Sequence, residues 1–221
     1  ISMIKRKPAS DAWPGVFAGD EVLTTALTCT ATNWPILANG LNIKWVDADP
    51  ETCNLDLQDL EEKLSEKTKI IVVVHWGGYP VDLDRLKKIQ EKSLELYGFS
   101  PLIVEDCAHG FGSKYKNLYL GNHGNYACYS FQAIKHLTSV DGGALVLPDQ
   151  EEYQRAKLLR WYGIDRESNR KDFRCEEDIP EWGFKFHMND VNASIGLHNL
   201  RHVGAAIDRH KQNAHFYDQN L

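Results

Sequence analysis

The chain has 221 residues, of which 43% are apolar and 25% are charged, and its formal net charge is −6. This length fits one large domain, or one domain and part of a second, with a sizeable core. Acidic and basic residues are interspersed without a basic run, which argues against a nucleic-acid partner. The longest apolar run, residues 70–74, is far too short to span a bilayer, so we expect no membrane partner.

The cysteines and histidines give no sign of a disulfide framework or a metal site. The five cysteines are odd in number, widely scattered and without a C-x-x-C pair, which indicates a reducing compartment. His198, His202 and His210 are spaced for one helix face, but no acidic third ligand follows their spacing. The N-terminal stretch also lacks the apolar segment of a secretory signal. We therefore expect no bound metal and a cytoplasmic location.

Hydrophobic patterning divides the chain into alternating strands and helices. Residues 1–18 sustain no period. Strands are predicted at residues 21–25, 42–47, 70–74, 101–104, 126–131 and 144–147. Helices are predicted at residues 30–41, 56–64, 82–97 and 149–162, and from 189 to the end. Residues 165–181 are polar and charged, which is typical of a loop.

This alternation predicts an α/β fold, with a mostly parallel sheet flanked by helices on both faces. The β-branched run at residues 70–74 is typical of a strand that is buried on both faces. Ligands of such sheets bind at the carboxyl ends of the strands. His75 and Trp76 follow that run, and they either line such a site or pack within a turn.

Lys135 stands in the turn between two apolar strands, at residues 126–131 and 144–147. Lysine is strongly solvated, so one interpretation is an ordinary surface loop. The other is an amine that forms a Schiff base with a carbonyl, which is the commonest covalent chemistry of lysine. The turn alone favours the surface loop, because few lysines occupy perturbed sites.

Asp106 directly follows another apolar strand, at residues 101–104. It either caps the segment that follows or pairs functionally with Lys135 across neighbouring strand ends. Pyridoxal phosphate (PLP) requires such a pair. The lysine holds the aldehyde, and the carboxylate keeps the pyridine nitrogen protonated.

Six segments closely resemble the DegT/DnrJ/EryC1/StrS aminotransferases. They are GDEV at 19–22, HWGGYPVD at 75–82, VEDCAH at 104–109, YSFQAIK at 129–135, DGG at 141–143 and GFKFHMND at 183–190. The resemblance covers roughly residues 17–221, and the segments occur in the family's order. These proteins are sugar-nucleotide aminotransferases of the aspartate aminotransferase fold, PLP fold type I.

The resemblance implies a role for five residues. Lys135 resembles the Schiff-base lysine, which also shuttles a proton, and Asp106 resembles the partner of the pyridine nitrogen. Ser130 matches the hydroxyl that donates to the cofactor phosphate. His109 falls where the family has Gln or His near the phenolic oxygen, although a histidine in a capping turn is the alternative. His187 falls where relatives reach across a dimer interface towards the phosphate.

The sequence also departs from the family pattern. Cys29 stands where an aromatic usually stacks on the ring, so Trp34 replaces that aromatic or the ring face is packed differently. Gln132 replaces a frequent histidine, and Asp141 a frequent glutamate.

The family's phosphate-gripping segment is not recognisable before residue 19, and its C-terminal small domain is not recognisable at the other end. We therefore expect a chain that lacks parts of both ends. Residues 1–200 are expected to form the PLP-binding large domain, with residues 1–18 poorly defined. Residues 201–221 are expected to form a helix that leads towards a truncated small domain.

The resemblance implies an aminotransferase that moves an amino group from an amino acid, with glutamate expected, to a nucleotide-linked keto-sugar. It also implies a homodimer with shared active sites. Two alternatives stay open. One is a non-catalytic or regulatory homologue of the same fold. The other is a PLP-dependent sugar dehydratase, which the presence of Lys135 disfavours because those relatives carry histidine there.

Overall fold

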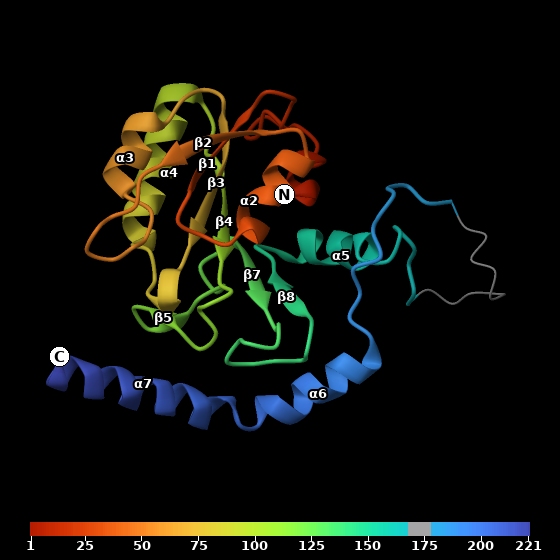
Figure 1. The fold of residues 1–221 in the computed structure, drawn as a ribbon. Helices are drawn as coiled ribbons and strands as arrows, with labels where there is room; N and C mark the ends of the chain where they lie inside the picture. Colours follow the sequence, from red (N-terminus) through yellow and green to blue (C-terminus); the bar gives the residue numbers. More distant parts are fainter. Residues whose placement is uncertain (168–177) are drawn as a thin grey trace.

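The computed structural model describes residues 1–167 and 178–221, and its centre is a six-stranded sheet (Figure 1). The strands stand in the order β2–β1–β3–β4–β7–β8. Their bounds are Glu21–Thr25 for β1, Asn42–Val46 for β2, Thr68–Val74 for β3, Leu102–Asp106 for β4, Tyr126–Ser130 for β7 and Gly143–Val146 for β8. Every neighbouring pair is parallel except β7 and β8, which run antiparallel. The predicted fold class is confirmed.

Helices cover both faces of this sheet (Figure 1). Their bounds are Ser2–Lys5 for α1, Thr30–Ala38 for α2, Leu57–Lys63 for α3, Leu83–Tyr97 for α4, Gln150–Leu159 for α5, Asp190–Leu200 for α6 and Val203–Asn220 for α7. A short 3₁₀ turn, η1, spans Trp76–Gly78, and a small hairpin pairs β5, Lys114–Tyr115, with β6, Leu118–Tyr119. Asp56 and Asp82 accept backbone N–H groups at the starts of α3 and α4, which satisfies donors that a helix leaves free.

Strand β3 contributes to a separate core on each face of the sheet. Ile71 and Val73 pack with residues of α3 and α4, whereas Ile70 and Val72 pack with residues of α1 and α2. Successive side chains of a strand point to opposite faces. All seven residues of β3 are therefore buried, as the β-branched run predicts.

Two sequence expectations differ from the structure, and two others are not tested by it. Within the poorly patterned residues 1–18, Ile4, Trp13 and Val16 are buried core residues. The single helix expected from residue 189 is two helices, because the chain turns at Arg201 between α6 and α7. Most of the loop expected at residues 165–181 lies outside the described residues. The division into a large domain and a following helix stays a prediction.

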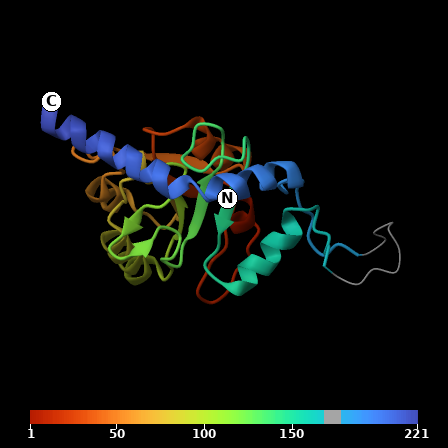
Figure 2. The same cartoon turned by 90° about the horizontal axis from the view of Figure 1, so that it is seen from below.

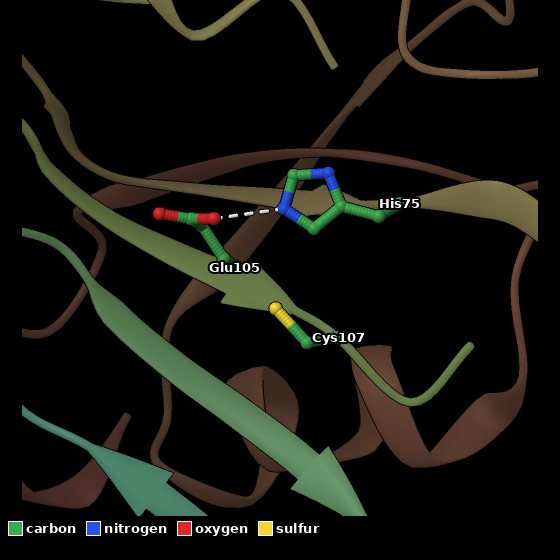
Figure 3. Close-up of side chains that lie close together, drawn as sticks. All are labelled: His75, Glu105 and Cys107. Atoms are coloured by element: carbon green, nitrogen blue, oxygen red, sulfur yellow. Dashed lines mark hydrogen bonds and ion pairs between the residues drawn. The ribbon is translucent and has the colours of Figure 1, made fainter. Parts of the chain in front are cut away.

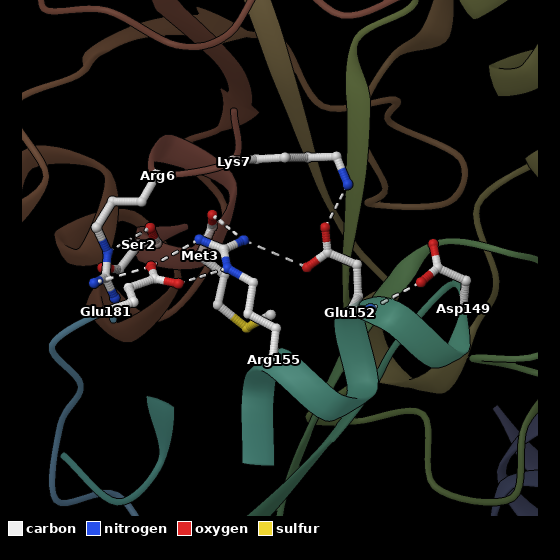
Figure 4. Close-up of polar contacts among 8 residues, drawn as sticks. All are labelled: Ser2, Met3, Arg6, Lys7, Asp149, Glu152, Arg155 and Glu181. Atoms are coloured by element: carbon white, nitrogen blue, oxygen red, sulfur yellow. Dashed lines mark hydrogen bonds and ion pairs between the residues drawn. The ribbon is translucent and has the colours of Figure 1, made fainter. Parts of the chain in front are cut away.

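An ion-pair network fixes the N-terminal helix against α5 (Figure 4). The guanidinium of Arg155 makes two parallel 2.9 Å hydrogen bonds to Glu181 and a third, of 3.0 Å, to the carbonyl of Met3. Arg6 lies 3.1 Å from the same Glu181 carboxylate. Two-pronged arginine–carboxylate pairs are geometrically specific. The network therefore accounts for the position of a segment that has no hydrophobic period.

Helices α6 and α7 run across the edge of the sheet at which the parallel strands end (Figures 1 and 2). Ile207 of α7 packs against Gly112, where an added Cβ would lie 2.7 Å from the Ile207 Cδ1. Within residues 1–167 and 178–221, no helix combines the length and apolarity that crossing a bilayer requires.

Candidate active site

The carboxyl ends of the parallel strands β1, β3, β4 and β7 meet at one edge of the sheet. The chain leaves β1 towards β2 but leaves β3 towards β4, so the strand order reverses between β1 and β3. Ligands of open α/β sheets bind outside the strand ends at such a reversal. The loops that follow these four strands therefore form the candidate site.

Asp106 is the last residue of β4, and three elements contact it. Its Oδ2 accepts a 2.6 Å hydrogen bond from the hydroxyl of Thr32 in α2, and its Oδ1 accepts one of 3.0 Å from the Ala108 N–H. Its carbonyl accepts the N–H of His75, at the end of β3, over 3.1 Å. The carboxylate is thus oriented by the chain on both sides, and it does not cap a following helix.

His109 lies in the loop after β4, beside the η1 turn. Its Nδ1 accepts the Gly77 N–H at 3.4 Å, and its ring meets the Trp76 ring edge-on with centroids 5.5 Å apart. Burial and then the positive charge of Lys135 lower the pKa of His109, while Asp106 acts in the opposite direction. A neutral imidazole that accepts at Nδ1 carries its proton on Nε2. His109 therefore offers one hydrogen-bond donor to this site.

Lys135 lies in the loop between β7 and β8. The loop is closed at its base, where the Phe131 N–H donates to the Gly142 carbonyl, and Lys135 N–H donates to the Gln132 carbonyl. Within residues 1–167 and 178–221, the Lys135 amine makes no hydrogen bond or ion pair. Ser130 precedes the loop and accepts the Gln132 N–H at 3.3 Å, so its own hydroxyl proton stays available for a ligand.

Helix α6 holds the Lys135 loop in place. The amide of Asn192 donates to the Asp141 carbonyl at 2.7 Å, and that of Asn199 donates to the Thr138 carbonyl at 2.9 Å. Further along, His136 meets His210 of α7 with ring centroids 4.9 Å apart. Polar contacts with α6 therefore fix the loop, together with the buried side chain of Leu137.

A buried cluster of His75, Glu105 and Cys107 lies behind this site (Figure 3). The His75 Nε2 lies 2.8 Å from Glu105 Oε2, and its Nδ1 accepts the Val81 N–H at 3.1 Å. The other oxygen of Glu105 accepts the Asn125 amide at 2.7 Å. His75 is therefore a buried partner of Glu105 and not a residue that lines the site.

The donor atoms of this cluster lie within 4.8 Å of one another, as they would around a metal ion. However, both imidazole nitrogens and both carboxylate oxygens already have hydrogen-bond partners. Burial, with Glu105 nearby, raises the pKa of the Cys107 thiol, which keeps it protonated. Metals bind the thiolate. The arrangement therefore fits a structural hydrogen-bond cluster.

The contact recorded for the His187 side chain among the described residues is with Trp161 and not with the other four predicted residues. Its ring meets Trp161 edge-on, with centroids 4.2 Å apart, and its buried Nδ1 has no hydrogen-bond partner among the described residues. No contact joins it to Lys135 or Ser130 in the described parts of this protomer. Its role across a subunit interface stays a prediction.

Sequence reasoning missed Thr32, which is buried and bonded to Asp106. The usable signal is a hydroxyl one turn into the helix that follows β1. That hydroxyl could be assigned to the site only once β1 is known to lie beside β3, at the reversal of strand order.

Comparison with known proteins agrees with the fold. A model of the DegT/DnrJ/EryC1/StrS aminotransferase family matches residues 10–221. The chain belongs to this family.

Individual members of the DegT/DnrJ/EryC1/StrS family are similar over most of the chain. GDP-perosamine synthase of Escherichia coli O157:H7 is 33% identical over 207 residues, 94% of this chain and 53% of the synthase. The structure of AtS13 from Actinomadura melliaura is 54% identical with a TM-score of 0.87, over 90% of this chain and 53% of that one. The structure of the sugar aminotransferase CalS13 from Micromonospora echinospora is 51% identical with a TM-score of 0.86, over 92% of this chain and 55% of that one. The chain spans about half the length of these relatives.

The donor set at the strand ends fits PLP, the cofactor of this family. A carboxylate, Asp106, suits a protonated ring nitrogen, and an unpaired amine, Lys135, suits an aldehyde. Both act on the pKa of His109, so each of the two groups lies within electrostatic reach of that imidazole. The Ser130 hydroxyl at the end of the adjacent strand suits a phosphate oxygen.

Proposed function

We propose that the protein is a PLP-dependent aminotransferase that moves an amino group from glutamate to a nucleotide-linked keto-sugar. The observation that carries this proposal is the convergence of Asp106, His109 and Lys135 at the carboxyl edge of the sheet. Family membership supports the same chemistry.

When bound, PLP supplies an aldehyde that receives the amino group and a ring that holds the electron pair released at the reacting carbon. Lys135 would hold that aldehyde until the amine of the donor displaces it, and its freed Nζ would then take a proton from the reacting carbon and return it. Asp106 pairs with the ring nitrogen. His109 donates from Nε2 to the phenolic oxygen, and the Ser130 hydroxyl donates to the phosphate.

We further propose a homodimer in which His187 of one subunit reaches towards the phosphate held by the other. Large apolar side chains stay exposed on α6 and α7, which supports an interface there. They are Val191, Leu197, Leu200, Phe216 and Tyr217. A cytoplasmic location is part of the same proposal and is supported by the scattered cysteines, of which the four described are free.

The test is amino transfer by the purified full-length protein with PLP, glutamate and a panel of nucleotide-linked keto-sugars. We expect one 2-oxoglutarate for each amino-sugar formed, both detected by mass spectrometry, and neither with Lys135→Ala. Loss of water from the sugar without consumption of glutamate would establish a dehydratase instead. Bound PLP without conversion of any sugar would leave the non-catalytic homologue as the correct account.

A further inference from the structure

Thr32 contacts the carboxylate of Asp106 although 74 positions separate the two residues. Thr32 lies in the first turn of α2, and its side chain is buried, with 8% of the residue exposed. Its Oγ1 is 2.6 Å from Asp106 Oδ2, which is the usual distance for a hydroxyl that donates to a carboxylate. Because the buried Thr32 hydroxyl belongs to another element, its hydrogen bond restricts the orientation of the Asp106 carboxylate.

The hydrogen bonds around Thr32 run in one direction. An ionised carboxylate only accepts, so the Thr32 hydroxyl donates its single proton to Asp106. Its oxygen then accepts from the hydroxyl of Thr28, 2.7 Å away. A chain of donors that ends on a negative charge strengthens each of its members. Thr28, Thr32 and Asp106 therefore form an oriented relay.

The second oxygen of the Asp106 carboxylate is held independently. The Ala108 N–H donates to Oδ1 at 3.0 Å, while Thr32 donates to Oδ2. Two donors on different oxygens fix the rotation of the carboxylate group. Each oxygen keeps a further acceptor position, because a carboxylate has about four. The carboxylate can thus accept one more donor in a plane that the protein has already set.

We propose that Thr32 is a positioning residue that holds the carboxylate of Asp106 in the plane where it meets the protonated ring nitrogen of the cofactor. This inference rests on the proposed function, because it assigns the ring nitrogen of PLP to Asp106. Thr32 acts through Asp106 and has no assigned contact with the cofactor. It lies in α2, the helix that follows β1, on the opposite side of the strand-order reversal from Lys135.

If the Thr32 hydroxyl only joined α2 to β4, its removal would weaken the binding of every ligand of the site equally. A positioning residue affects only ligands that use the ring nitrogen. The experiment therefore compares PLP with its analogue in which a carbon replaces that nitrogen. Dissociation constants are measured by equilibrium dialysis on the purified full-length protein, with Thr32→Val, Thr32→Ser and Thr30→Val. Thr30→Val is the matched control, since Thr30 is exposed in the same helical turn.

We expect Thr32→Val to weaken PLP binding about tenfold, as loss of a bond to a charged group does. The serine variant keeps the donor, so its affinity for PLP should stay within about twofold of wild type. The carbon analogue should bind wild type and Thr32→Val equally well. Thr28→Val should weaken PLP binding in the same direction by about threefold, and it provides the test if Thr32→Val does not fold.

Equal losses for PLP and for the carbon analogue would overturn the positioning role, and so would unchanged PLP affinity in both valine variants. The proposed function is tested separately by the wild-type protein. If wild type binds no PLP, the proposed function fails and the inference fails with it. If wild type binds PLP and the two ligands respond alike to Thr32→Val, only the inference fails.

Discussion

The imidazole Nε2 of His75 lies 2.8 Å from the carboxylate Oε2 of Glu105, and neither side chain is exposed to solvent. Because Val81 N–H donates to the His75 Nδ1, the imidazole donates from Nε2 to Glu105. The Asn125 amide donates to the other carboxylate oxygen. Glu105 is thus a buried acceptor between two donors, one residue before Asp106.

Glu105→Gln should lower the free energy of unfolding by about 1–3 kcal/mol, because the glutamine amide can accept from only one of the two donors. Urea unfolding followed by circular dichroism measures this loss. Glu95→Gln, on the exposed side of α4, is the matched control and should change stability by less than about 0.5 kcal/mol. Equal stability of the two variants would show that the buried carboxylate is not needed as a double acceptor.

Arg155→Met should destabilise the fold by about 1–3 kcal/mol, because it removes the two-pronged bond to Glu181 and the bond to the Met3 carbonyl. The exposed pair of Lys92 and Glu61 is the comparison. Lys92→Met should cost less than about 1 kcal/mol, as exposed ion pairs do. Thermal unfolding of both variants measures the contrast, and a larger loss in the Lys92 variant would contradict it.

Gly143→Ala should disrupt the pairing of β7 with β8, and with it the Lys135 loop. A Cβ at Gly143 would lie 2.5 Å from the Tyr129 carbonyl oxygen, which the sheet holds in place. Hydrogen exchange by mass spectrometry should show faster exchange in residues 127–146. Gly204→Ala is a useful comparison, because Gly204 is helical and its Cβ would meet nothing within 4 Å. Unchanged exchange in the Gly143 variant would mean that the strands adjust without separating.

The His109 imidazole should titrate below its usual pKa of about 6.5 in the cofactor-free protein. Lys135→Ala should raise this pKa by removing a repelling charge, and Asp106→Asn should lower it further. Because the folded-state pKa is lowered, the unfolded chain binds the proton of His109 more readily than the folded chain does. The contribution of His109 to the free energy of unfolding is therefore complete above about pH 6.5, and it declines as the pH falls below that value.

NMR titration of the imidazole signals measures these shifts, with Lys87→Ala on the exposed side of α4 as a control that removes a charge not among those acting on His109. A His109 pKa above its usual value, or a fall with Lys135→Ala and a rise with Asp106→Asn, would show that Lys135 and Asp106 do not act on this histidine as described.

The sheet was largely predictable because its strands are short, continuous apolar runs. The observed β1 has the predicted bounds, and β3 is buried on both faces as its β-branched residues indicate. Helix α1 could not be predicted, since four residues are too few for a period and the helix is held by polar contacts with Arg155.

The candidate site was predictable only where residues follow strands. The placement of Asp106 and Ser130 at strand ends depends on local sequence alone. The contact of Thr32 with Asp106 and the burial of His75 against Glu105 depend on which strands are neighbours. Strand order cannot be predicted from any single segment of the sequence.

The central claim is that Lys135 binds PLP covalently through its amine. The most direct measurement is the visible absorption of the purified full-length protein with saturating PLP, before and after borohydride reduction, followed by peptide mass spectrometry. We predict a visible absorption band from the covalent adduct of PLP with lysine, and a reduced PLP adduct on the Lys135 peptide, both lost in Lys135→Ala. Absence of the band in wild type, or an adduct on another lysine, would contradict the account.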